Sequence, residues 1–384
     1  MKNLLFTILA VLACIAVKSQ DIYTSGYFTN DSGPKIAAVF KNGEMLYGQK
    51  QIGKDMYSSA MAIDTVNGDI YWSANAFPLN SISDSYGNVM KNDEILLDNV
   101  IGTCINDISF DGGDIYSAGY MNDIYESIAA VWKNGETTPL YTYCTDKHSS
   151  VVLGIDVVDG VVYACGYYEE GLHYGCVWVN GDLYAIHPNS EVTGITYHDG
   201  DIYYLLDECT TSVYKSGEEF FELQNYGGSC SDVNAIIVAD NDVYTAGFLG
   251  FIDCVVWRNA DCIYLHPFGA EAAFNACQYF DQSLYYVGWD HEGRGIVFKD
   301  GVLIYSLDNC AFYDVWLMPS PLAVEEIEAE DSSVVYIYNF FGELVKTVRA
   351  DGKTLNVSDL PSGFYIAKCG DKVTKIFSSG ASIR

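Results

Sequence analysis

Residues 289–294 form the densest group of side chains in this sequence that could take part in chemistry. The six positions include Trp289, Asp290, His291 and Arg294. A flat aromatic ring stacks on the C–H face of a sugar, while charged groups beside it bond the hydroxyls. This combination favours a binding site for a glycan, with a surface protein as the alternative ligand.

Four further side chains stand in loops that we expect on the same face of the molecule. They are Tyr86, Tyr125, His173 and Tyr174. A simpler interpretation is that tyrosine is frequent here, with 31 copies, and that these rings only cover sheet edges. The sequence leaves both interpretations open.

Known catalytic patterns are missing from the sequence. The six histidines show no H-E-x-x-H or other short metal-ligand spacing, and there is no Gly-x-Ser-x-Gly, phosphate loop or dinucleotide fingerprint. We therefore predict no catalytic residue, no metal ligand and no cofactor. A polysaccharide lyase or glycoside hydrolase stays as the alternative, because a site can draw single residues from several repeats.

A repeated structure must position these loops, because one motif recurs seven times. It consists of a turn residue, an aliphatic residue and a tyrosine, and the tyrosines follow one another at intervals of 40 to 48 residues. These tyrosines are Tyr23, Tyr71, Tyr116, Tyr163, Tyr203, Tyr244 and Tyr285.

A second motif follows each first one: an apolar segment with one large side chain, then a turn pair such as Asn134-Gly135. Asn-Gly predicts a tight hairpin, because both residues accept positive φ. The large side chains suggest packing between neighbouring repeats. They are Phe40, Met90, Trp132, Trp178, Tyr214, Trp257 and Phe298.

The other turns of the repeats carry aspartates. We interpret these as turn residues rather than calcium ligands, because the loops lack EF-hand spacing. They are Asp111, Asp159, Asp199, Asp240 and Asp281.

Each repeat thus predicts four short strands, which is typical of a β-propeller blade. We expect an all-β chain with a seven-bladed propeller at residues 20–318. The first repeat begins at its second strand, near Asp21, and residues 311–317 look like an unpaired first strand. We expect this strand beside residues 21–27, where it would close the ring.

Composition limits the partners. Asp and Glu number 51 against 20 Lys and Arg, a formal charge of −31, which repels phosphate backbones and argues against nucleic acid. No apolar run after the N-terminal segment is long enough to span a membrane. With 49% hydrophobic residues the chain can bury a core, and we expect a monomer.

Residues 1–19 have the pattern of a signal peptide, with Lys2 before an apolar stretch and small residues near Ser19. A lipoprotein route through Cys14 is the alternative. An oxidising compartment would permit disulfides among the 12 cysteines. Cys165 with Cys176, and Cys209 with Cys230, are candidate pairs, and buried thiols are the alternative.

The composition changes at an acidic linker, residues 319–331, and residues 332–384 are again rich in strand-forming residues. The motifs at 335–339, 342–345, 359–366 and 372–376 resemble the C-terminal sorting domain of type IX secretion substrates. A small stabilising β-sandwich is the alternative. The resemblance implies a tail recognised by the type IX machinery, and a protein that is secreted or attached to the outer cell surface.

These observations together predict an exported β-propeller that binds a glycan or a surface protein without catalysis. A structural scaffold on the cell surface is a further alternative. The acidic surface is compatible with each of these functions.

Overall fold

The computed structural model contains β-strands and no helix in the part of the chain that it describes. Described are residues 20–30, 33–51, 53–78, 85–97, 102–122, 127–140, 149–208, 210–224, 231–250, 253–268, 271–319, 334–338, 344–349, 360, 363–369 and 372–378. The chain divides into two compact units, Ile22–Leu317 and a second unit that contains the C-terminal strands. The signal-peptide prediction falls outside the described residues.

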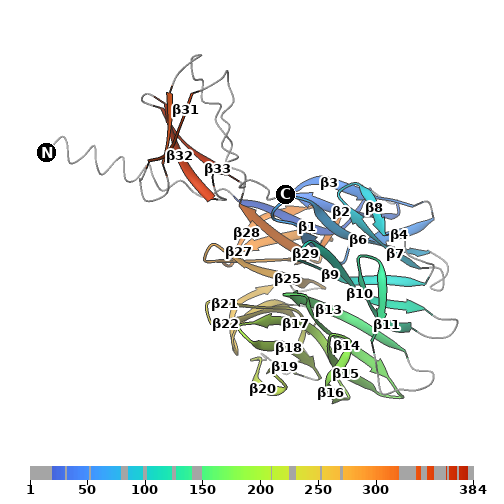
Figure 1. The fold of residues 1–384 in the computed structure, drawn as a ribbon. Coiled ribbons are helices and arrows are strands. Elements are labelled where there is room, and N and C mark those ends of the chain that lie inside the picture. Colours follow the sequence, from blue (N-terminus) through green and yellow to red (C-terminus); the bar gives the residue numbers. More distant parts are fainter. Residues whose placement is uncertain are drawn as a thin grey trace. The chain divides into compact units, whose positions relative to one another are not determined.

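The larger unit consists of antiparallel sheets built mostly from consecutive strands (Figure 1). The first sheet has the order β29-β1-β2-β3, with bounds Cys310–Pro319, Gln20–Thr29, Lys35–Lys41 and Glu44–Gln49. The second has the order β4-β6-β7-β8, with β5 also paired to β6, and bounds Lys54–Tyr57, Ile70–Pro78, Tyr86–Lys91, Glu94–Leu97 and Met61–Ile63.

The remaining five sheets of this unit each follow chain order. The third and fourth sheets of the unit consist of β9 Thr103–Asp111, β10 Asp114–Asn122, β11 Ser127–Lys133 and β12 Glu136–Pro139, and of β13 Ser150–Val158, β14 Val161–Glu169, β15 His173–Val179 and β16 Asp182–Pro188. The fifth and sixth consist of β17 Glu191–His198, β18 Asp201–Asp207, β19 Thr211–Lys215 and β20 Glu218–Glu222, and of β21 Ser231–Ala239, β22 Asp242–Leu249, β23 Asp253–Arg258 and β24 Asp261–Pro267. The seventh consists of β25 Ala273–Phe280, β26 Ser283–Trp289, β27 Gly295–Lys299 and β28 Val302–Leu307. The predicted four-stranded repeats are thereby confirmed.

Turn chemistry explains where the strands end. Asn134 has φ 49° and Gly135 has φ 87°, so the pair adopts the left-handed conformation that a two-residue hairpin needs. The aspartates Asp159, Asp199, Asp240 and Asp281 also have φ between 48° and 51°. They occupy tight turns, as the sequence predicts.

Burial follows the position of a strand in its sheet. The second and third strands, such as β14 and β15, are largely buried, while the last strand, β16, alternates between exposed and half-buried residues. Trp178 on β15 is fully buried and packs in one cluster with Tyr116 and Ala129 of the preceding sheet. Trp257 likewise packs with residues of the β17–β20 sheet. Large side chains at this repeat position therefore join neighbouring sheets.

The first strands of five sheets carry a bulge, and in four of them the bulged side chain bonds the next sheet. The bulged residue Asn106 donates from Nδ2 to Val152 O at 2.7 Å, and Asn275 donates to Phe312 O at 2.8 Å. Thr193 and Asn234 make the corresponding bonds to Val233 O and Phe274 O at 2.8 and 3.3 Å. At Leu153 the side chain is apolar, so this position has no such donor.

Strand β29 is far from β1 in sequence but lies beside it in the first sheet. The Thr29 N–H donates to Asn309 O at 2.8 Å, at the edge of this pairing. Asn275 bonds this sheet to the preceding one through Phe312, and Asp314 accepts the Met61 N–H of the following sheet at 2.8 Å. The first sheet thus combines residues from the beginning and the end of the larger unit.

The C-terminal strands form one further antiparallel sheet in the order β31-β30-β32-β33. Their bounds are Leu344–Arg349, Val334–Tyr338, Gly363–Cys369 and Lys372–Ser378. In β30, Val335 and Ile337 are fully buried, while Tyr336 between them is exposed. This alternation is the expected pattern for a sheet with one packed face.

Candidate functional site

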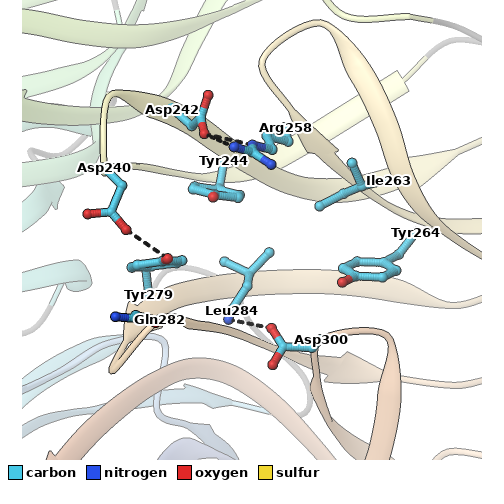
Figure 2. Close-up of a pocket in the computed structure, with 10 residues that line it drawn as sticks. All are labelled: Asp240, Asp242, Tyr244, Arg258, Ile263, Tyr264, Tyr279, Gln282, Leu284 and Asp300. Atoms are coloured by element: carbon cyan, nitrogen blue, oxygen red, sulfur yellow. Dashed lines mark hydrogen bonds and ion pairs between the residues drawn. The ribbon is translucent and has the colours of Figure 1, made fainter.

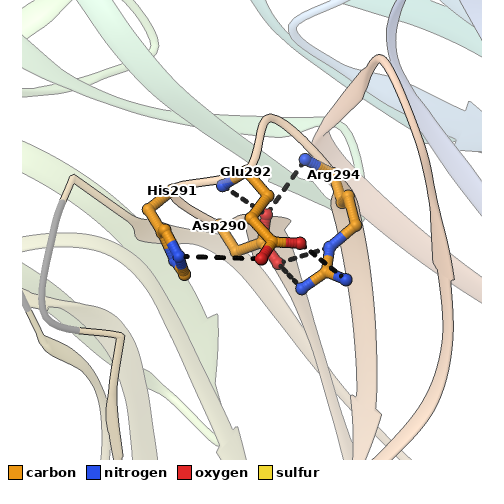
Figure 3. Close-up of polar contacts among 4 residues, drawn as sticks. All are labelled: Asp290, His291, Glu292 and Arg294. Carbon is orange, nitrogen blue, oxygen red and sulfur yellow. Dashed lines mark hydrogen bonds and ion pairs between the residues drawn. The ribbon is translucent and has the colours of Figure 1, made fainter.

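The predicted loop at residues 289–294 connects β26 to β27 and holds its own charged groups together (Figure 3). Asp290 is fully buried. Its Oδ1 accepts the N–H groups of Glu292 and Arg294 at 3.1 and 3.0 Å, and its Oδ2 accepts Nε and Nη2 of Arg294 at 2.9 and 2.7 Å. The Asp290 carboxylate therefore stabilises the loop instead of facing a ligand.

The other members of this loop are more exposed. Arg294 also bonds Glu292, with Nη1 to Oε2 at 2.9 Å, and the Asp290 carboxylate raises the pKa of the Arg294 guanidinium. His291 is exposed and Trp289 is half-buried. Trp289, Asp290, His291 and Arg294 thus lie close together, and Asp290 and Arg294 are bound to each other.

The remaining predicted ligand residues lie on other sheets. His173 begins β15, stacks on Tyr167 at 4.8 Å and has its Nδ1 at 2.5 Å from Glu191 Oε1. Tyr174 stacks on Tyr168 at 4.9 Å. Tyr86 begins β7, and the Lys54 ammonium lies 4.0 Å from its ring centroid. Tyr125 lies outside the described residues.

The predicted disulfide between Cys165 and Cys176 is wrong. Cys165 is in register with Val177, and Cys176 is in register with Gly166, so the two thiols point to opposite faces of the sheet. Cys176 Sγ donates to Tyr174 O at 3.4 Å, and burial raises the pKa of Cys165. Cys209 and Cys230 lie outside the described residues.

The repeated motifs found in the sequence bond to each other. In the third sheet, Asn134 Nδ2 donates to Asp114 Oδ1 at 2.7 Å, and Lys133 Nζ lies 2.7 Å from Asp114 Oδ2. The same ammonium lies 5.1 Å from the ring centroid of Tyr116. The lysines that hold this place in four other repeats lie 5.1–5.6 Å from the repeated tyrosine: Lys41, Lys91, Lys215 and Lys299.

Two repeats depart from this arrangement. In the β13–β16 sheet, Val179 holds the position of the lysine and is in register with Tyr163. In the β21–β24 sheet, Arg258 holds it and is in register with Tyr244. The arginine position lies in a cavity between two sheets.

This cavity, of 440 Å³, lies between the β21–β24 sheet and the β25–β28 sheet, and we call it the tyrosine groove (Figure 2). Its volume is within the range of small-ligand sites. The lining residues are Asp240, Asp242, Tyr244, Arg258, Ile263, Tyr264, Tyr279, Gln282, Leu284 and Asp300.

Two half-buried tyrosines line the tyrosine groove, and a buried tyrosine supports each of them. Tyr279 stacks on Tyr244, with ring centroids 5.3 Å apart and an interplanar angle of 20°. Tyr264 stacks on Tyr286 at 5.9 Å and 25°. Figure 2 shows the rings of Tyr279 and Tyr264 on two sides of Leu284. Stacking holds both rings in fixed orientations before any ligand arrives.

The carboxylates of the groove differ in their bonding partners. Asp242 Oδ2 binds Nε of Arg258 at 2.7 Å and also its Nη2, and the guanidinium lowers the pKa of this carboxyl. Tyr279 donates its hydroxyl to Asp240 Oδ2 at 2.8 Å, and Leu284 N–H donates to Asp300 Oδ1 at 2.8 Å. Polar groups that bind and orient a hydroxylated ligand are therefore present beside the two rings.

Sequence reasoning missed this site because the groove combines residues from different repeats. The available signal was Arg258, which replaces the lysine of the other repeats. Asp240 was identified only as a turn residue.

A second, smaller cavity of 210 Å³ is lined by first-strand residues of six sheets of the larger unit and by Ser59, between β4 and β5 of the second sheet, and we call it the central cavity. Two half-buried carboxyl groups lie in it. Asp107 Oδ2 accepts Ile155 N–H at 2.8 Å, and Asp314 accepts Met61 N–H and Val315 N–H at 2.8 and 2.7 Å. Burial raises the pKa of Asp107 to about 7 and of Asp314 to about 8.

Among the described residues, no group of three or more His, Cys, Asp or Glu is arranged to hold a metal ion. That part of the chain also contains no helix long and apolar enough to cross a membrane.

Comparison with solved structures finds distant likenesses. The computationally designed Ika8 protein is 15% identical and matches over 86% of this chain and 99% of its own, with a TM-score of 0.43. The WD40 β-propeller domain of Doa1 is 14% identical, over 77% of this chain and 93% of that one, also at 0.43. A sialidase of Trypanosoma rangeli is 11% identical, over 72% and 56%, at 0.43. No curated protein matches the chain.

Residues 319–379 match the family model described as the secretion system C-terminal sorting domain. The match confirms the resemblance seen in the sequence motifs of the tail. It indicates a protein secreted to the cell surface or beyond, and the alternative of a lipoprotein anchored through Cys14 has no support. The matched segment includes all four C-terminal strands, β30 to β33, and is similar to the sorting domains of secreted proteins.

Proposed function

We propose that this chain is an exported seven-bladed β-propeller that binds a glycan, without catalysis, in the tyrosine groove. Residues 1–19 would direct export, residues 20–318 would form the propeller, and the segment after the linker 319–331 would engage the type IX machinery. A cell-surface or released binding protein is the role that this organisation serves.

The closed ring is supported by three observations. The β29 strand lies beside β1, so the first sheet joins the two ends of the unit. Residues from all the sheets of this unit line one central cavity. The bulge side chains bond one first strand to the next, including the contacts that flank the β29 sheet. Closure removes the exposed sheet edges that would otherwise promote aggregation.

Glycan binding is carried by one observation: two tyrosine rings, each backed by a second tyrosine, line a cavity that also contains hydrogen-bonding carboxylates. A sugar ring can lie against tyrosine while its hydroxyls bond Asp240 or Asp300. Rings that are held in place before binding cost little conformational entropy when the ligand arrives.

A non-catalytic role agrees with the state of Asp242. Glycoside hydrolysis needs a carboxylic acid that keeps its proton at neutral pH. The Arg258 guanidinium instead lowers the pKa of Asp242 and holds this group ionised. Asp242 is therefore unsuited to act as the general acid of such a reaction.

The test is a glycan array probed with the secreted protein and three variants. Tyr279→Ala should weaken binding at least about tenfold, because it removes a stacking ring. Tyr197→Ala is the matched control: Tyr197 stacks on Tyr163 at 4.7 Å at the equivalent position between the β13–β16 and β17–β20 sheets. Trp289→Ala tests the loop at 289–294.

Loss of binding in Tyr279→Ala alone would support the proposal. Loss in Trp289→Ala alone would move the site to the loop and overturn the groove. Binding to no glycan, or release of a shortened sugar from the recognised glycan, would overturn the proposed function itself.

A further inference from the structure

We infer that the tyrosine groove selects glycans that carry free amino groups, such as glucosamine oligomers, over their N-acetylated or anionic counterparts. This inference rests on the proposed function and names the ligand class of the same site. It follows from the carboxylates of the groove that form no ion pair within the protein.

One of the three aspartates in the groove is neutralised within the protein. Asp242 receives both Nε and Nη2 of Arg258, and its Oδ1 accepts Asn259 Nδ2 at 2.7 Å. Arg258 is the only cationic side chain among the residues that line the groove. Its charge is committed to Asp242, so it leaves no free cation for an anionic ligand.

The other two aspartates keep an oxygen available. Asp240 uses Oδ2 for the Tyr279 hydroxyl, and Asp300 uses Oδ1 for the Leu284 N–H. No bond from a described residue reaches Asp240 Oδ1 or Asp300 Oδ2, and both residues are exposed. Two negative charges are thus left facing a ligand, at opposite ends of the site drawn in Figure 2.

The equivalent position around Tyr163 and Tyr197, between the β13–β16 and β17–β20 sheets, lacks most of this charge. Val161 and Val179 stand where Asp242 and Arg258 stand in the tyrosine groove, and Ser216 stands in place of Asp300. Asp159 has the same turn geometry as Asp240, with φ 51° at both positions. The second uncompensated carboxylate is therefore a feature of the tyrosine groove and does not follow from the repeat itself.

An ammonium group on a sugar ring fits this arrangement. It donates three hydrogen bonds, and its positive charge complements the carboxylates of Asp240 and Asp300. The sugar ring then lies on Tyr279 or Tyr264. An N-acetyl group removes that charge, and a carboxylate or sulfate reverses it. The formal charge of −31 on the whole chain adds to the repulsion of anionic glycans.

A lysine side chain of a protein offers the same ammonium without the sugar ring. The two supported tyrosines favour the sugar, because they provide flat surfaces on both sides of Leu284. The experiment separates these two sources of the charge.

The test is titration calorimetry of the full secreted protein at pH 6 and 150 mM salt. The probes are chitosan hexamer, chitin hexamer, a sulfated oligosaccharide and hexalysine. We expect at least about tenfold tighter binding of chitosan hexamer than of chitin hexamer. Asp240→Asn and Asp300→Asn should each reduce this preference several-fold, because each removes one uncompensated charge while keeping the side-chain shape.

Asp159→Asn is the matched control, because asparagine accepts the same left-handed turn and the position lies outside the tyrosine groove. Equal loss in Asp159→Asn would mean that only the overall charge attracts the polycation, and would overturn the inference. Hexalysine binding as tight as that of chitosan hexamer would overturn it as well.

The two proposals fail differently. Equal binding of chitin and chitosan hexamers, lost in Tyr279→Ala, would overturn the amine preference and leave glycan binding in place. Failure of every glycan on the array and in the titrations would overturn both.

Discussion

The central cavity and the tyrosine groove both contain aspartates, but they use them in opposite ways. Asp107 and Asp314 are half-buried, and backbone N–H groups of the following sheets bond their carboxyl oxygens. Asp240 and Asp300 are exposed, and each keeps one oxygen without a partner among the described residues. The same residue type thus joins sheets in one place and faces solvent in the other.

The difference shows that the partner of an aspartate, more than its presence, decides its role. A buried acceptor that satisfies backbone donors of a neighbouring sheet contributes to stability. An exposed carboxylate whose second oxygen is open contributes little to folding and is available to a ligand. Three experiments test this contrast.

The largest effect is expected from Asp314→Ala. This change leaves the Met61 and Val315 N–H groups without their acceptor inside the central cavity, so the free energy of unfolding should fall by about 3 kcal/mol. Asp240→Asn in the groove should change it by less than about 0.5 kcal/mol. Urea denaturation at pH 6 measures both, and equal effects would abolish the contrast between the two cavities.

The pH dependence of stability should also separate the cavities. Native Asp107 and Asp314, with pKa values of about 7 and about 8, hold protons that the unfolded chain releases near its ordinary pKa of 3.8. The free energy of unfolding should therefore fall as the pH rises from about 4 to about 8.

The double variant Asp107→Asn/Asp314→Asn should remove part of this fall, on the order of 2 kcal/mol over the same window. Burial also raises the pKa of Asp207 to about 7. This residue is present in both proteins, so its contribution cancels when their pH dependences are compared. Urea midpoints at several pH values give the comparison. Parallel curves for the two proteins would contradict the assigned role of the buried pair.

The smallest effect is expected from Arg258→Lys in the groove. Lysine holds this place in other repeats and bonds the repeated aspartate there, as Lys91 does with Asp69 at 2.8 Å. The free energy of unfolding should change by less than about 0.5 kcal/mol, and glycan affinity by less than about threefold. Lys215→Arg is the reciprocal control, and a tenfold loss of affinity in Arg258→Lys alone would place the guanidinium on the ligand.

The repeats were predictable from the sequence because their defining contacts are local. An aspartate at the start of one strand and an asparagine in the next turn bond each other within about one hairpin, as Asp114 and Asn134 do. The same pair recurs as Asp69 with Asn92 and as Asp242 with Asn259, so the repeat can be recognised in the sequence. The pairing of residues 311–317 with the first repeat was also predictable from the sequence. The first repeat has no first strand of its own, and residues 311–317 form a strand that belongs to no other repeat.

The site was not predictable in this way, because its contacts join different repeats. Asp240 and Tyr279 are 39 residues apart and meet only after two sheets have packed together. The loop at 289–294 differs, because its contacts are local. Asp290 and Arg294 are close enough in sequence to neutralise each other, so a dense group of charged residues became a turn.

The place of β29 beside β1 has a consequence for how the chain acquires its structure. Thr29 and Asn309 are 280 residues apart, and their pairing is among the last that a growing chain can make. Until residue 319 has been synthesised, the first sheet has an unpaired edge at β1, which is open to other strands. Pairing of β29 with β1 therefore requires the closure of a long loop, and a chain truncated before Cys310 would keep this edge exposed however well its other sheets had formed.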